Sequence, residues 1–244
     1  MARFVLVHGA FVGSWIWGPL AERLEELGHT VEAPDLPGSG DDTTPVEEVT
    51  LDAYTERICE VLAGADQPAI LVANSMGGIV ISQAAARRPD RVKRLVYVAA
   101  FLPGDGQSLT DLTALPEAAD DLVQATISVS GDPPVGTIPD STCRASNHDC
   151  SPEVIGWAVG MTGSQALEPL TRPVSLNSEF ESIPRSYVIC NRDRIVPPAL
   201  QRRLVEDRQV TDVVELEAGH HPQLSRIDEL ARTLHQRAGA EVPA

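Results

Sequence analysis

The sequence of 244 residues predicts an α/β fold, a mainly parallel, doubly wound sheet of about six strands. Short runs rich in Val, Ile and Leu alternate along the chain with amphipathic stretches. The runs are continuously apolar, which is typical of strands that helices cover on both faces. Alternation of this kind implies one sheet with right-handed crossovers. The length fits one domain, or one domain that carries an insertion.

Six segments have the composition of buried strands. They are 3–8 (RFVLVH), 30–35 (TVEAPD), 69–74 (AILVAN), 94–100 (RLVYVAA), 186–190 (SYVIC) and 212–216 (DVVEL).

Four stretches between or after these strands have helical signals. In residues 15–28 the apolar side chains recur at helical spacing, and Gly28 provides a C-terminal stop. A second helix is expected after a Thr50 cap. The third, GGIVISQAAARRPD, stops near Pro89, and the last is expected to start around Pro222.

The alternation is lost in the middle of the chain, between about residues 102 and 180. A structureless loop of that length would be unusual in a compact domain. We therefore expect a core formed by 1–101 and 181–244, with a helical cap inserted at 102–180.

Charge and hydropathy exclude several classes of partner. The formal net charge is −16 and the basic residues are scattered, so phosphate backbones and anionic membrane surfaces are not expected partners. No apolar run has transmembrane length, and the opening ARFVLVHGAF is better explained as a buried strand than as a signal peptide. We expect a cytoplasmic protein.

The four cysteines are too few and too dispersed for a disulfide framework, so reduced thiols are expected. Cys143 and Cys150 flank RASNHD and could form a bridge, or could hold a metal together with His148. No second ligand pair is evident, and we predict neither a metal nor a cofactor.

The stretch VANSMGG, residues 72–78, is one residue short of the G-x-S-x-G turn that exposes a nucleophilic serine between a strand and a helix. Ala73 stands where that pattern has its first glycine. The position needs a small side chain because it packs near a tight bend, and alanine meets this need. Ser75 is the predicted nucleophile, and a structural turn serine is the alternative.

A nucleophilic serine needs a base to take its proton and an acid to orient that base. Asp193 follows the strand SYVIC and His220 follows DVVEL, which gives the order Ser, Asp, His that α/β-hydrolases use. The ends of parallel strands are where open α/β sheets bind ligands. Asp207 or Glu206 could replace the acid, and the neighbouring His221 could replace the base.

The stretch VHGAF ends the first predicted strand, and its small residues let backbone approach a reacting carbonyl. We assign the N–H groups of Ala10 and Met76 as the two donors to the oxyanion. Phe11 follows the first of these donors and is expected to line the substrate pocket. His8 is expected to fix this loop through hydrogen bonds.

These motifs resemble the α/β-hydrolase superfamily, and within it the plant methylesterase and hydroxynitrile lyase group with its bacterial carboxylesterase relatives. The resemblance is carried by FVLVHGAFVGSWIWGPLAERLEELGHTVEAPDLPGSG, LVYVAAFLPGDGQS, HDCSPE, YVICNRDRIVPPALQRR and AGHHPQLSRIDELA, and is weakest at about residues 105–145. It implies a six-stranded, mainly parallel sheet, a helical cap, a deep apolar pocket and, often, a homodimer. It also implies that Ser75, Asp193 and His220 form a catalytic triad.

Two positions separate esterases from lyases within that group. The lyases carry Thr or Asn where this chain has Gly9, and some place a Lys directly after the catalytic His, where this chain has His221. Both differences favour an esterase, although His221 adds a titratable group to the pocket.

The sequence therefore predicts a cofactor-free serine esterase that cleaves a small, largely apolar ester through an acyl-enzyme. The alternatives are a hydroxynitrile lyase or related C–C lyase, a ligand-binding protein without catalysis, and a cofactor-free oxygenase on the same fold. The acyl and alcohol groups depend on the cap, which is the least recognisable part of the chain.

Overall fold

The computed structural model describes residues 1–239, and a six-stranded sheet forms its centre. The strands of this sheet are β1 (Arg3–Val7), β2 (Thr30–Glu32), β3 (Ala69–Ser75), β4 (Val92–Ala100), β8 (Arg185–Cys190) and β9 (Asp212–Leu216). They follow the order β2–β1–β3–β4–β8–β9, and every neighbouring pair is parallel. The predicted parallel sheet of six strands is confirmed.

The second strand is shorter than the sequence predicts. Residues 30–35 were expected to be extended, but β2 ends at Glu32 because it pairs with β1 over only three residues. Beyond it the chain turns, and the Asp35 carboxylate accepts the backbone N–H groups of Ser14 and Asp41. These bonds hold a loop together where the sequence suggested a strand.

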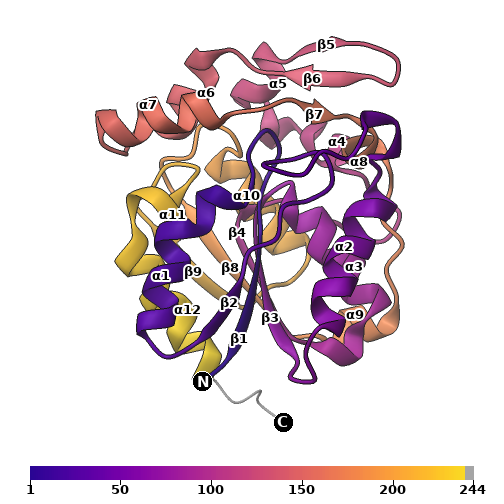
Figure 1. The fold of residues 1–244 in the computed structure, drawn as a ribbon, viewed down its shortest axis with the longest axis vertical. Coiled ribbons are helices and arrows are strands. Elements are labelled where there is room, and N and C mark those ends of the chain that lie inside the picture. Colours follow the sequence, from indigo (N-terminus) through magenta and orange to yellow (C-terminus); the bar gives the residue numbers. More distant parts are fainter. Residues whose placement is uncertain (240–244) are drawn as a thin grey trace.

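Helices cover both faces of the sheet, as Figure 1 shows. One face carries α1 (Gly18–Glu26), α11 (Pro222–Ser225) and α12 (Ile227–Gly239), and the other carries α2 (Leu51–Ala63), α3 (Gly77–Arg87) and α10 (Pro198–Asp207). The single last helix expected from Pro222 is therefore two helices, with a break at Arg226. The predicted Thr50 cap is confirmed, because its Oγ1 accepts the N–H of Ala53.

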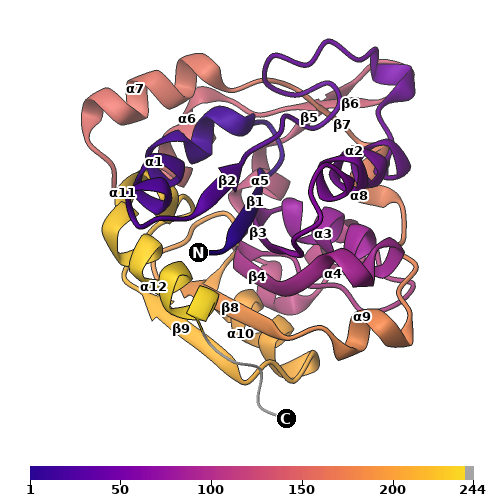
Figure 2. The same cartoon turned by 60° about the horizontal axis from the view of Figure 1, so that its bottom comes forward.

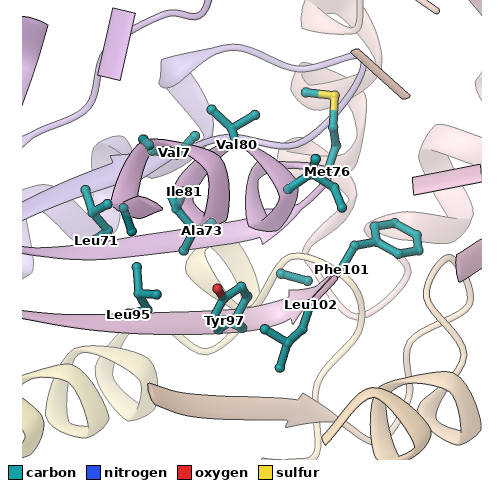
Figure 3. Packing of buried hydrophobic residues seen from close by; sticks show 14 of the residues in the cluster. Val7, Leu71, Ala73, Met76, Val80, Ile81, Leu95, Tyr97, Phe101 and Leu102 are labelled. Carbon is teal, nitrogen blue, oxygen red and sulfur yellow. The ribbon is translucent and has the colours of Figure 1, made fainter. Parts of the chain in front are cut away.

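The hydrophobic core consists of two clusters, one on each face of the sheet, because successive strand residues point to opposite faces. In β1, Phe4 and Leu6 pack against α1 and α12, whereas Val5 and Val7 pack against α2 and α3. Figure 3 shows the second of these clusters, where side chains of α3 lie over those of β3 and β4. Burial on both faces explains why the strand sequences are continuously apolar.

We call the segment between β4 and β8, residues 101–184, the connecting segment. Most of it lies across the carboxyl ends of the strands, and its last part returns to the opposite end of the sheet, where β8 begins (Figures 1 and 2). It contains the helices α4 (Leu109–Thr113), α5 (Leu122–Thr126), α6 (Asp140–Ser146), α7 (Pro152–Met161), α8 (Glu168–Thr171) and α9 (Ser178–Ser182). It also contains β5 (Ser128–Ser130), β6 (Val135–Thr137) and β7 (Gln165–Ala166), which form a small antiparallel sheet that the sequence did not indicate. These strands are too short to leave a periodic pattern.

Four short 3-10 turns complete the described elements, namely η1 (Ser14–Trp17), η2 (Val46–Glu48), η3 (Pro89–Arg91) and η4 (Pro116–Ala118). None of the helices within residues 1–239 combines the length and the apolar character that crossing a bilayer would require.

Candidate active site

A cavity of about 300 Å³ lies between the carboxyl ends of the sheet and the connecting segment. Its walls are mainly apolar, which fits a pocket for a small organic molecule. Five of the six site residues predicted from the sequence line this cavity, namely Ala10, Phe11, Ser75, Met76 and His220. The sixth, Asp193, is buried directly behind His220.

Ser75 sits at the sharp bend between β3 and α3. Its φ angle is +56°, in the left-handed region that side chains other than glycine rarely adopt. A strained backbone conformation of this kind persists only where the surrounding structure holds it in place, and such conformations are frequent at functional sites. The backbone N–H of Phe101 donates to the Ser75 carbonyl (3.0 Å) and ties the bend to the end of β4. Met76 is the N-cap residue of α3, and Figure 3 shows its side chain beyond the end of the strand.

The two glycines after Met76 are required by close backbone contacts. A β-carbon on Gly77 would lie 2.7 Å from the carbonyl oxygens of Val7 and His8. A β-carbon on Gly78 would lie 2.1 Å from the carbonyl oxygen of Phe101. Both positions exclude a side chain, so the helix can approach the sheet at the bend closely enough to present Ser75 to the cavity.

His220 and Asp193 form a buried pair. The Nδ1 atom of His220 lies 2.8 Å from Oδ2 of Asp193, and both side chains are almost fully buried. The other carboxylate oxygen accepts the backbone N–H groups of Ile195 (2.7 Å) and Val196 (3.1 Å). Gln201 of α10 donates to Oδ2 (3.2 Å). A carboxylate held by these three further donors can orient the imidazole of His220.

The residues that the sequence offered as alternatives have different contacts. Asp207 pairs with Arg203 at the surface and not with His220. The Nδ1 atom of His221 lies 2.9 Å from the amide oxygen of Asn147, so this histidine has no carboxylate partner. All four cysteines are free thiols, and no group of three or more potential metal ligands occurs in the described part of the chain.

The loop after β1 presents backbone to the cavity. Within residues 1–239, neither the Ala10 nor the Met76 N–H donates to another backbone or side-chain group. Phe11 has a φ of +65°, and its carbonyl accepts the N–H of Gly163 (2.8 Å) from the connecting segment. His8 braces the loop because its Nδ1 lies 2.8 Å from the carbonyl oxygen of Gly9.

His8 is held in its neutral form. Its Nε2 accepts the backbone N–H of Leu36 (3.1 Å), so the ring proton must be on Nδ1, which donates to Gly9. Burial lowers the pKa of His8 below its ordinary value of 6.5. A neutral ring satisfies both contacts, whereas a protonated ring would lose the bond from Leu36.

Asn74 is a positioning residue that the sequence did not single out, although it directly precedes the serine. It is fully buried, and its amide nitrogen donates to the carbonyl oxygens of Val98 (2.9 Å) and His220 (3.0 Å). The amide thus joins the end of β3, the strand β4 and the loop of the predicted base. The feature of the sequence that could have identified Asn74 is its polar side chain within an otherwise apolar strand.

Asp121, from the connecting segment, places a carboxyl group on the cavity wall. Its Oδ1 accepts the backbone N–H groups of Val123 and Gln124 at the start of α5. Burial raises the pKa of Asp121, and its attraction to His220 acts in the opposite direction. Nothing in the sequence placed this residue near His220, because the connecting segment has no recognisable pattern there.

Comparison with known proteins agrees with this architecture. The sequence is 30% identical over 247 residues to polyneuridine aldehyde esterase from Rauvolfia serpentina, covering 95% of this chain and 94% of that protein. It is also 30% identical over 248 residues to alpha-hydroxynitrile lyase from Arabidopsis thaliana, covering 90% of each.

A solved structure of a pyrethroid hydrolase from Sphingobium faniae JZ-2 superimposes with a TM-score of 0.89 at 26% identity, over 98% of both chains. The family model described as "Alpha/beta hydrolase family" matches residues 4–233, which is nearly the whole chain. The sheet order, the strand-to-helix bend at Ser75 and these matches lead to one conclusion: this chain belongs to the alpha/beta hydrolase family.

Proposed function

We propose that this chain is a serine esterase that cleaves small, largely apolar carboxylic esters without a cofactor. The observation that carries the proposal is the pairing of His220 Nδ1 with Asp193 Oδ2 at 2.8 Å, on the wall of the cavity that Ser75 enters. Esterase and hydrolase relatives along the whole chain support the same reaction type.

The proposed reaction uses the two ring nitrogens of His220 differently. Asp193 accepts the Nδ1 proton, which leaves Nε2 free to take the proton of Ser75 Oγ. The Oγ atom attacks the ester carbonyl carbon, and the developing oxyanion receives hydrogen bonds from the N–H groups of Ala10 and Met76. The C–O bond to the alcohol then breaks as His220 returns the proton to the leaving oxygen. Water, deprotonated by His220, releases the acid from Ser75 by the same steps in reverse.

The walls of the cavity limit the size and the polarity of the substrate. Phe11 and other apolar side chains line most of it, and its volume of about 300 Å³ fits a small ester. We propose that residues 102–180 act as the cap that selects the acyl and alcohol groups, and that 1–101 and 181–244 form the catalytic core.

The rival activity is a hydroxynitrile lyase reaction on the same triad. A β-carbon on Gly9 would lie only 2.8 Å from Cβ of Ser75, so this position holds a glycine next to the nucleophile. The lyases of the group were expected to carry Thr or Asn there, and the glycine therefore favours an esterase.

The decisive experiment compares the wild type with Ser75→Ala on a panel of methyl, aryl and lactone esters and on mandelonitrile. We expect hydrolysis of esters by the wild type, loss to background in the variant, and labelling of Ser75 by a fluorophosphonate. Ester turnover by Ser75→Ala would refute the mechanism. Cyanide release as the main activity would establish the lyase, and ligand binding without turnover or labelling would establish a binding protein.

We also propose that the protein acts in the cytoplasm on a small-molecule ester and forms a homodimer. Four free thiols, three of them buried, fit a reducing compartment. Light scattering coupled to gel filtration measures the oligomeric state directly.

A further inference from the structure

His221 is a second histidine on the cavity wall, and the proposed mechanism does not use it. Its ring centre lies 4.7 Å from that of His220, and only 6% of the residue is exposed. A group that binds at His221 is therefore within a few bond lengths of the reacting carbonyl.

The hydrogen bonds of Asn147 determine which nitrogen of His221 carries the proton. The Nδ2 atom of Asn147 donates to the carbonyl oxygen of Cys143 (2.8 Å) and to Oγ of Ser146 (3.1 Å), so its Oδ1 faces His221. That oxygen can only accept, and it lies 2.9 Å from Nδ1 of His221. The proton of a neutral His221 is therefore on Nδ1, and Nε2 is an acceptor.

The ring is also held neutral. Burial, with the nearby His220 as a second cause, lowers the pKa of His221 well below its ordinary value of 6.5. Within residues 1–239, no hydrogen-bond donor contacts Nε2, although the ring forms part of the cavity wall. The site thus offers a fixed, neutral acceptor with no protein partner beside the catalytic base.

The other polar side chains near Asn147 on this wall already have partners. The hydroxyl of Ser146 donates to the carbonyl of Cys143, and that of Thr142 is bonded to Thr126. The hydroxyl of Thr162 donates to the carbonyl of Ala158. These hydroxyl groups are already bonded within the protein, whereas no hydrogen bond to Nε2 of His221 occurs within residues 1–239.

We propose that His221 is a specificity-determining residue whose Nε2 accepts a hydrogen bond from a substrate hydroxyl group placed within two or three bonds of the scissile carbonyl. This inference rests on the proposed esterase function and names its substrate class as hydroxy esters. An ester without the hydroxyl would displace water from Nε2 and leave it unpaired, and an unpaired buried acceptor is costly.

The test uses three esters that share the 3-phenylpropanoate skeleton: methyl 3-phenyllactate (each enantiomer), its 2-methoxy ether, and methyl 3-phenylpropanoate. The wild type is expected to prefer one hydroxy ester over both others by at least about tenfold in kcat/KM. The methoxy ester keeps the oxygen atom but cannot donate and is larger, whereas methyl 3-phenylpropanoate is smaller. A preference over both therefore separates hydrogen bonding from shape. Equal kcat/KM values for the three esters in the wild type would overturn the inference.

The variants His221→Leu and His221→Gln test whether the preference for the hydroxy ester comes from His221. His221→Leu should abolish the preference for the hydroxy ester, and His221→Gln, which can place an amide oxygen near the position of Nε2, should retain part of it. A merely structural role would lower kcat/KM for all three esters equally and leave their ratio unchanged, which would also overturn the inference.

Failure of the specificity inference can be distinguished from failure of the esterase proposal. If Ser75 reacts with the fluorophosphonate and methyl 3-phenylpropanoate is hydrolysed in a Ser75-dependent way, the function stands whatever the ratio. If neither occurs, the esterase function itself is wrong, and the specificity inference falls with it.

Discussion

A β-carbon on Gly9 would lie 2.8 Å from Cβ of Ser75 and 3.4 Å from its Oγ. Two carbon atoms that are not bonded do not approach so closely, so any side chain at position 9 must displace the nucleophile or the loop after β1. The absence of a side chain at position 9 thus helps to fix where the nucleophile stands in the cavity.

Gly9→Ala is therefore expected to lower kcat by about 10²-fold, because a misplacement of about 1 Å at the reacting atoms costs that much. Gly9→Thr should lower it further. Gly18→Ala is the control, since a β-carbon on Gly18 would meet no atom within 4 Å. Steady-state kinetics with a p-nitrophenyl ester measures the effect, and unchanged kcat in Gly9→Ala would contradict the steric argument.

Asp193→Asn tests the pairing with His220. The amide group can present its NH₂ to Nδ1 and so favour the wrong tautomer, in which Nε2 carries the proton and cannot accept one from Ser75. We expect kcat to fall by about 10⁴-fold while the protein stays folded. Asp207→Asn is the matched control at the surface, where the carboxylate pairs with Arg203. Similar activity in the two variants would show that Asp193 does not orient the base.

Ala73→Val and Ala73→Gly test the bend before the nucleophile. Ala73 is fully buried, and its β-carbon faces Gly77 at the start of α3, so two further methyl groups would press on the helix. We expect Val to reduce activity strongly and to destabilise the fold by about 1–3 kcal/mol, as overpacking does. Gly should reduce activity much less. Equal kcat values in the two variants would refute this explanation of why alanine stands in the turn.

Asp121→Asn removes a negative charge from the cavity wall and keeps the helix cap, because an amide oxygen can also accept the two N–H groups at the start of α5. We expect kcat/KM for monomethyl succinate to rise relative to that for methyl butanoate by about tenfold when measured at pH 8. Asp120→Asn is the control, because it makes the same change of charge one residue away at the surface. If the ratio of the two kcat/KM values is the same in the wild type and in both variants, the carboxylate of Asp121 does not select against anionic esters.

Stability should depend on pH through His8 and His221. Burial lowers the pKa of both below the ordinary value of 6.5, so the unfolded chain binds more protons than the folded chain once the pH falls below about 6.5. The free energy of unfolding should be highest above that pH and should decrease on acidification, by up to about 1.4 kcal/mol per pH unit and histidine. Urea denaturation between pH 7.5 and 5.5 measures the slope.

His221→Gln isolates one of the two contributions, because glutamine does not titrate. The free energy of unfolding of this variant should change less between pH 7.5 and 5.5 than that of the wild type. If the slopes are the same, the ring of His221 is not held neutral in the folded protein.

The sequence by itself determined the parallel sheet, because burial on both faces makes strands continuously apolar, and this pattern is local. It also determined the residues at the strand ends. Ser75 ends one strand, and Asp193 and His220 follow two others. Parallel strands bring their carboxyl ends to one edge of the sheet. Local pattern and topology together were sufficient to place these side chains at one edge.

Only the tertiary structure decided which groups complete the cavity. Asp121 and Asn147 come from the connecting segment, whose short helices and strands leave no periodic signal, and their positions depend on how that segment packs over the sheet. The choice between His220 and His221 as base was likewise open in the sequence, because adjacent residues differ only in direction. The structure gives the two rings different partners, a carboxylate for His220 and an amide for His221, which lie 27 and 74 residues away along the chain.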